Sequence, residues 1–144
     1  METSPASLRV SVVQFEAIPS DPVRDLQIVG AMAEEAAAQG SRLVVFPEMC
    51  LLGYWHLTKM TADELFALAE PADGPLVSQV AALAESLGVG IGVGFLELSE
   101  GRLFNSYAVC LPDGAVPGSS HCRVRPSSSP RTRRAAPAPA APMV

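Results

Sequence analysis

Apolar and polar positions follow two different periods along the first hundred residues of the chain. Residues 8–15 alternate as in a β-strand, and residues 43–46 are continuously apolar, as in a strand that is covered on both faces. Between them, apolar residues recur at helical spacing. These residues are Val23, Leu26, Val29, Ala33 and Ala36. The order of strand, helix and strand predicts two parallel neighbouring strands joined by a crossover helix.

Capping signals mark the ends of three predicted helices. Asp21 before Pro22 supplies an N-cap and a first-turn proline for the first helix, which runs until Gly40. The spacing of Thr61 and Glu64 is that of a capping box, which predicts a short helix over residues 62–69. A third helix begins at Pro75 and ends at Gly88, and its apolar face consists of Leu76, Val80, Leu83 and Leu87.

Two further strands are predicted after the third helix, over residues 90–96 and 105–111. The short polar turn between them favours a hairpin. Glycines alternate along the first of these strands, at Gly90, Gly92 and Gly94. A dinucleotide site needs Gly-x-Gly-x-x-Gly at the start of a helix, whereas these glycines follow a helix. We therefore interpret them as positions of close packing rather than as a nucleotide-binding loop.

The charges divide the chain into two unlike parts. Residues 1–118 contain all 15 acidic residues and five of the ten basic ones, a formal charge of −10, whereas residues 119–144 carry +5. The acidic body argues against nucleic acid or an anionic membrane as a partner. The tail is rich in Arg, Pro, Ser and Ala and has no apolar face, which predicts disorder. We expect a flexible amino terminus over residues 1–7, one α/β domain over residues 8–118 and a disordered tail over residues 119–144.

Three cysteines give no disulfide framework and favour a cytoplasmic protein with reduced thiols. Cys110 lies within a predicted strand and is expected in the core, and Cys122 falls in the tail, where no role is assigned to it. The histidines and cysteines do not show zinc spacing, so no metal site is expected. The chain also shows neither a signal peptide nor an apolar stretch long enough for a membrane span.

The candidate catalytic residue is Glu48, because it follows the apolar strand at its carboxyl end, where ligands bind in parallel sheets. Contact with Phe46, Tyr54 and Trp55 would desolvate this carboxylate and raise its pKa toward that of a general base. The alternative is a solvated loop glutamate. Tyr54 and Trp55 are candidates for lining an acyl pocket, or they cap the core. Cys50 either pairs locally with Glu48 or is a buried small hydrophobe.

Five motifs, taken together and in this order, resemble the nitrilase superfamily of carbon–nitrogen hydrolases. They are Val10 to Phe15, Val44 to Glu48, Gly53-Tyr54, Gly92 to Phe95, and Phe104 to Tyr107 with Asp113-Gly114. The resemblance implies an α-β-β-α sandwich, of which this chain would form a part. It also implies hydrolysis of a small-molecule amide, carbamoyl or nitrile group by a Glu-Lys-Cys triad without a cofactor, in which Glu48 matches the glutamate that transfers protons.

The other two members of the triad have no match in this sequence. Ser120, His121 and Cys122 fill the place of the family's lysine, and the only lysine, Lys59, lies in another segment. The nucleophilic cysteine belongs to a later strand of the family fold. We therefore expect the amino-terminal half of a hydrolase, inactive alone and prone to self-association through uncovered strands. A reading-frame change near Gly118 is one hypothesis for the tail. The alternative function is a catalytically dead binding or regulatory module that pairs with a complete homologue or uses its basic tail.

Overall fold

The computed structural model describes residues 7–124, which form one five-stranded sheet in the order β1-β2-β3-β4-β5. The strands are β1 (Val10–Val12), β2 (Leu43–Val45), β3 (Gly90–Ser99), β4 (Arg102–Cys110) and β5 (Ser119–Val124). β1, β2 and β3 are parallel, and β4 and β5 add antiparallel to β3 in turn. The α/β class, the parallel pair around the first helix and the hairpin of β3 and β4 are confirmed, although β1 is shorter than the predicted strand over residues 8–15.

Four helices connect or follow the parallel strands: α1 (Pro22–Ala38), α2 (Tyr54–Leu57), α3 (Ala62–Leu68) and α4 (Pro75–Leu87). The predicted caps are confirmed. The Asp21 side chain accepts a hydrogen bond from the amide of Arg24, Thr61 and Glu64 form a capping box, and Gly88 ends α4 with a φ of 64°. Sequence patterns did not predict α2. Among the described residues, no helix has the length and apolar character needed to cross a membrane.

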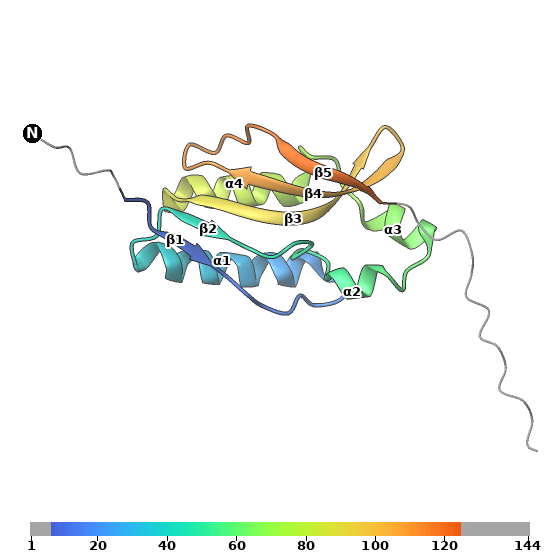
Figure 1. Ribbon diagram of the computed structural model, residues 1–144, viewed down its shortest axis with the longest axis horizontal. Helices are drawn as coiled ribbons and strands as arrows, with labels where there is room; N and C mark the ends of the chain where they lie inside the picture. Colours follow the sequence, from blue (N-terminus) through green and yellow to red (C-terminus); the bar gives the residue numbers. More distant parts are fainter. Residues whose placement is uncertain (1–6, 125–144) are drawn as a thin grey trace, which may run out of the picture.

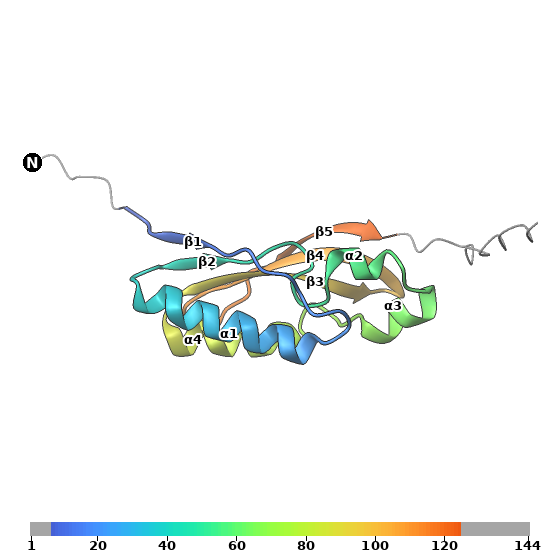
Figure 2. The same ribbon diagram turned by 90° about the horizontal axis from the view of Figure 1, so that it is seen from below.

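The two long helices, α1 and α4, lie side by side on one face of the sheet (Figures 1 and 2). They bury alternate residues of the strands beneath them, as the pleat of a sheet requires. This core includes Val29 and Ala33 of α1, Val77, Val80 and Ala84 of α4, and Val44, Ile91, Val93 and Phe95 of the strands. The main apolar cluster therefore lies between the sheet and this pair of helices.

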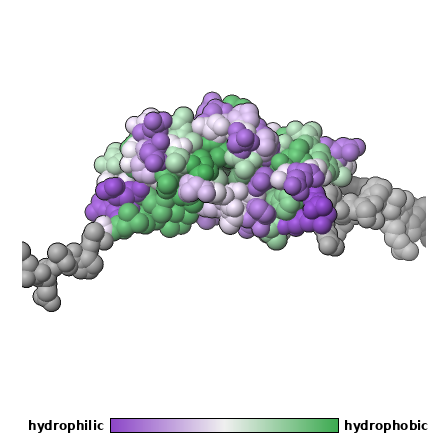
Figure 3. Space-filling view, turned by 90° about the horizontal axis from the view of Figure 1, so that it is seen from above, coloured by the Kyte–Doolittle hydropathy of each residue, from purple (hydrophilic) through white to green (hydrophobic). Residues whose placement is uncertain are grey.

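The opposite face of the sheet begins with residues that reach solvent. Val10 and Val12 of β1 are 44% and 81% exposed, because their side chains point away from α1 and α4. A second, smaller apolar cluster lies at the other end of the sheet, where α2 and α3 meet β3 and β5. The surface view shows hydrophobic side chains reaching the surface in patches between hydrophilic ones (Figure 3).

Strand β5 corrects the predicted boundary of the disordered tail. Residues 119–124 pair with Leu103 to Ala108 of β4, so the prediction of disorder from Ser119 is wrong for these six residues. Main-chain hydrogen bonds to a neighbouring strand need no continuous apolar face, and the tail's composition therefore concealed them. The rest of that predicted tail, residues 125–144, and residues 1–6 of the predicted flexible amino terminus lie outside the described residues.

Candidate active site

The chain is held firmly just before it reaches Glu48. The amide of Phe46 donates to the carbonyl oxygen of Gly92 at 2.9 Å, and the hydroxyl of Tyr107 donates to the carbonyl oxygen of Phe46 at 2.8 Å. Burial raises the pKa of Tyr107 to about 12, so its hydroxyl stays protonated and remains a donor. The end of β2 is thereby fixed to both β3 and β4, two residues before the candidate carboxylate.

Gly94 of β3 lets the loop that carries Glu48 lie directly against the sheet. A Cβ atom at this position would overlap the amide nitrogen of Met49 and lie 2.9 Å from the carbonyl carbon of Glu48. Gly92 is packed in the same way against the ring of Tyr107, whose hydroxyl would be 2.8 Å from an added Cβ. The interpretation of these glycines as close-packing positions is confirmed, with a loop and a tyrosine ring as the neighbours.

The carboxylate of Glu48 is exposed and accepts a hydrogen bond from the side-chain amide of Asn105 on β4. The expected desolvation by Phe46 is wrong, because Phe46 is buried on the core side, where its ring packs edge-on against Phe15 at 6.2 Å. The strand ends at Val45, and Met49 has a φ of 52°. The regular alternation therefore stops, and the loop carries Glu48 outward.

Tyr54 and Trp55 lie in α2, beside Glu48. Their rings are in edge-to-face contact at 5.6 Å, and Trp55 is 78% exposed. Together with Glu48 they line a cleft of about 390 Å³. His56 in the same helix shares a hydrogen bond of 2.8 Å with the hydroxyl of Ser20, which ties α2 to the loop before α1. The structure thus brings the three candidate site residues together, and the substrate-binding role of the two aromatic residues stays a prediction.

Two of the three cysteines are unsuited to nucleophilic chemistry. Burial raises the pKa of Cys50 to about 12, and its thiol donates to the carbonyl oxygen of Gly94 at 3.6 Å. Burial also raises the pKa of Cys110 to about 11. Both thiols therefore remain protonated near neutral pH, and Cys50 is the buried small hydrophobe of the two alternatives. Among the described residues, no group of three or more His, Cys, Asp or Glu side chains is arranged to hold a metal ion.

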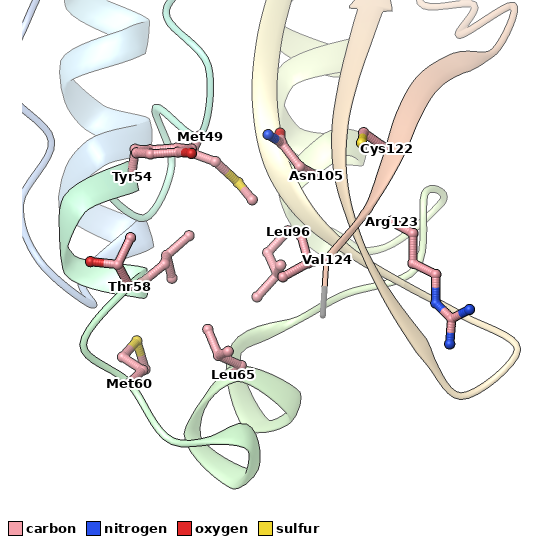
Figure 4. Close-up of a pocket in the computed structure, with 11 residues that line it drawn as sticks. Met49, Tyr54, Thr58, Met60, Leu65, Leu96, Asn105, Cys122, Arg123 and Val124 are labelled. Atoms are coloured by element: carbon pink, nitrogen blue, oxygen red, sulfur yellow. The ribbon is translucent and has the colours of Figure 1, made fainter. Parts of the chain in front are cut away.

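Cys122 lies at the site, although its position in the predicted tail gave it no role. It is exposed, and in the register of β4 and β5 it stands opposite Asn105, the partner of Glu48. Directly opposed residues of an antiparallel pair point to the same face of the sheet. The thiol of Cys122 is therefore on the same face as the amide of Asn105, and Figure 4 shows the two side chains close to each other.

A second cavity of about 430 Å³ adjoins Glu48 through Asn105. It lies between α2 and α3 on one side and β3, β4 and β5 on the other (Figure 4). Its walls are mainly apolar and are formed by Met49, Tyr54, Leu57, Thr58, Met60, Leu65, Leu96, Asn105, Cys122, Arg123 and Val124. Met49 and Tyr54 also line the cleft beside Glu48, so the two hollows share a wall. The carboxylate lies near both.

A buried polar pair stabilises the strands around the site. The hydroxyl of Ser106 donates to a carboxylate oxygen of Glu97 at 2.5 Å, and that carboxylate, on β3, is only 6% exposed. Ser119 of β5 is 3.5 Å from the same oxygen. The contacts link three strands. Sequence reasoning gave no role to Asn105, Ser106 or Tyr107, although three polar residues within an otherwise apolar strand were a usable signal.

Comparisons with known proteins agree with this arrangement. The sequence profile of the family described as carbon-nitrogen hydrolase matches residues 9–136. A hydrolase of Mycobacterium tuberculosis is 36% identical over 108 residues, which are 73% of this chain and 35% of the relative. A nitrilase of Bradyrhizobium diazoefficiens is 32% identical over 113 residues, covering 69% of this chain and 35% of that protein.

A solved structure is similar in fold as well as in sequence. It is a CN-hydrolase superfamily protein of Xanthomonas campestris with an arsenic adduct in its active site. The TM-score is 0.66 at 31% identity, and the match covers 79% of this chain and 40% of the other. The chain thus spans about a third of the length of the curated relatives that it matches.

Proposed function

The chain belongs to the carbon–nitrogen hydrolase family, and from this membership we propose that it carries the proton-transferring part of a hydrolytic site. The substrate would be a small molecule with an amide, carbamoyl or nitrile group. The placement of Glu48 carries the proposal. The residue follows a parallel strand at its carboxyl end, is oriented by Asn105 and lies beside two cavities.

In this proposal Glu48 accepts a proton from the attacking group and returns it to the leaving nitrogen. An exposed carboxylate with one hydrogen-bonded oxygen keeps its second oxygen for that transfer. Asn105 has a second N–H group, which can donate to the oxygen of a bound amide while the first holds Glu48. Tyr54 and Trp55 would enclose the substrate from the side of α2.

We propose that the 144-residue chain alone does not hydrolyse such substrates. Catalysis through a covalent intermediate needs an activated nucleophile and a cation for the developing charge. The thiol of Cys50 is buried and protonated, and Lys59, the only lysine, lies between α2 and α3 rather than on β5. A proton carrier without these partners leaves the bond-forming step undone.

The test is an activity assay of two proteins. The full chain should release no ammonia from simple amides or nitriles above the buffer rate. A chimera that joins residues 8–118 to the remaining length of the M. tuberculosis relative should be active, and Glu48→Gln should lower its kcat by about 10²–10⁴-fold. Full activity of the Glu48→Gln chimera would overturn the role of Glu48 and favour a binding module. Ammonia release by the full chain that disappears on Glu48→Gln would overturn its inactivity.

We also propose self-association through the exposed face of β1, with a second copy of the chain as the partner. The exposed Val10 and Val12 support this, because apolar side chains on a sheet edge lose less free energy when they are covered. All three cysteines are free, which accords with a reducing compartment, and we propose the cytoplasm as the location.

A further inference from the structure

The cavity between α2, α3 and the strands is lined almost entirely by apolar side chains. Leu57, Leu65 and Leu96 are each less than 10% exposed in the protein and form its inner wall. Met49, Met60 and Val124 complete the apolar lining. Small-molecule sites usually enclose roughly 300–1,000 Å³ and combine apolar walls with a few polar groups, and the 430 Å³ here lies within that range.

The polar groups of this cavity are concentrated at one end. Asn105 and the thiol of Cys122 lie together near the carboxylate of Glu48. The hydroxyl of Thr58 is already used, since it donates to the carbonyl oxygen of Trp55 at 2.8 Å. Figure 4 shows the side chain of Arg123 directed away from the other lining residues. No charged group of the described residues therefore points into the apolar end.

We propose that this cavity binds the apolar part of the substrate, and that the substrate is an uncharged amide or nitrile with a branched aliphatic or aromatic group. The inference rests on the proposed function, because it places the reacting group at Asn105 and Glu48. An apolar group gains free energy by leaving water for walls of Leu, Met and Val. A charged or strongly polar group would lose its hydration there without gaining a partner.

Cys122 makes the proposal testable without turnover. It is exposed and lines the cavity, whereas Cys50 and Cys110 are buried, so N-ethylmaleimide should modify Cys122 first in the folded protein. A ligand that fills the cavity should slow this reaction. At a concentration ten times its Kd, 4-methylpentanamide should make the modification about tenfold slower, because only the unliganded fraction reacts.

The decisive comparison uses two further probes and two variants of the full chain. Acetamide, which has no apolar group, and succinamate, which is charged, should give no protection at the same concentration. Met60→Trp fills the cavity and should abolish protection by 4-methylpentanamide. Phe66→Ala on α3 removes an exposed apolar side chain outside the cavity and should leave protection unchanged. Circular dichroism confirms that each variant is folded.

The outcomes separate this inference from the proposed function. Equal protection by acetamide, or no protection by 4-methylpentanamide, would overturn the assignment of the apolar group to the cavity, whatever the role of Glu48. Glu48→Gln should leave protection within about twofold of wild type, because most of the binding free energy comes from the apolar walls. Protection with a Glu48-independent chimera would overturn the proposed function alone.

Discussion

The side-chain amide of Asn105 donates a hydrogen bond to the carboxylate of Glu48, although 57 residues separate the two in the sequence. The bond joins the middle of β4 to the loop that follows β2. An exposed glutamate samples several rotamers in water, and ordering it costs conformational entropy. Asn105 therefore selects the orientation of a carboxylate that is otherwise free to move, at the place where β5 and the apolar cavity begin.

Replacing Asn105 with aspartate should destabilise the protein more than replacing it with alanine. Asn105→Ala removes one hydrogen bond, at a cost of about 0.5–1.5 kcal/mol. Asn105→Asp places a second carboxylate against Glu48, and two like charges at this distance repel. The difference between the variants, measured by urea unfolding at pH 7, should shrink when both carboxylates are protonated near pH 3. A difference that does not change with pH would contradict the contact.

Gly94→Ala should disturb the candidate site more than any other single methyl group in β3. The added Cβ would overlap the amide of Met49, so the loop must move away from the sheet. Overpacking of this kind costs about 1–3 kcal/mol, and the Asn105 to Glu48 bond should weaken with it. Gly30→Ala in α1 is the matched control, because its nearest neighbour, Leu83, is 4.0 Å away. That change should stabilise the protein by about 0.5–1 kcal/mol in thermal unfolding.

The features that depend on neighbouring residues could be predicted from the sequence. The N-cap at Asp21, the capping box at Thr61 and the left-handed Gly88 are each specified within one helical turn. The parallel order of β1 and β2 follows from a strand, helix, strand pattern. The position of Glu48 at a strand end could also be predicted, because it needs only the end of an apolar run.

The features that depend on distant contacts could not be predicted. Nothing near Glu48 in the sequence indicates Asn105, and nothing in the composition of residues 119–124 indicates a partner strand. The first turn of α1 was misread for a related reason. Val23, predicted on the buried face, is 64% exposed, while Asp25 is fully buried because its carboxylate accepts a hydrogen bond from the amide of Ile18. A contact to the preceding loop thus overrides the apolar period.

Val12→Glu should reduce self-association of the chain. Val12 is 81% exposed on β1, away from α1 and α4, and a charge there would have to be desolvated when a second copy covers this face. Sedimentation over a range of protein concentrations should show a shift of the wild type toward larger species and a weaker shift of the variant. Val23→Glu is the control, because Val23 is equally accessible but lies on α1. Wild-type protein that stays monomeric throughout would rule out this interface.

Asp25→Asn should remove a pH-dependent loss of stability. Burial raises the pKa of Asp25 above its ordinary value of 3.8, the hydrogen bond from Ile18 opposes this, and the charge of Asp21 adds to it. One carboxylate oxygen of Asp25 has no hydrogen-bond partner among the described residues. Because the folded state binds the proton more tightly than the unfolded state, wild-type stability should fall as pH rises from 3.8 through the raised pKa.

The variant keeps an oxygen for the amide of Ile18 and carries no charge, so it should lack this fall. The free energy of unfolding of the variant minus that of wild type should therefore increase from pH 3 upward and become constant above the folded pKa of Asp25. Urea unfolding at several pH values measures this difference, in which the titration of all other groups cancels. Asp73→Asn, at an exposed aspartate, controls for the substitution itself. A difference that decreases with pH would mean that the folded protein favours the charged form, and would reverse the assignment of Asp25 as a buried acid that lacks a partner for one oxygen.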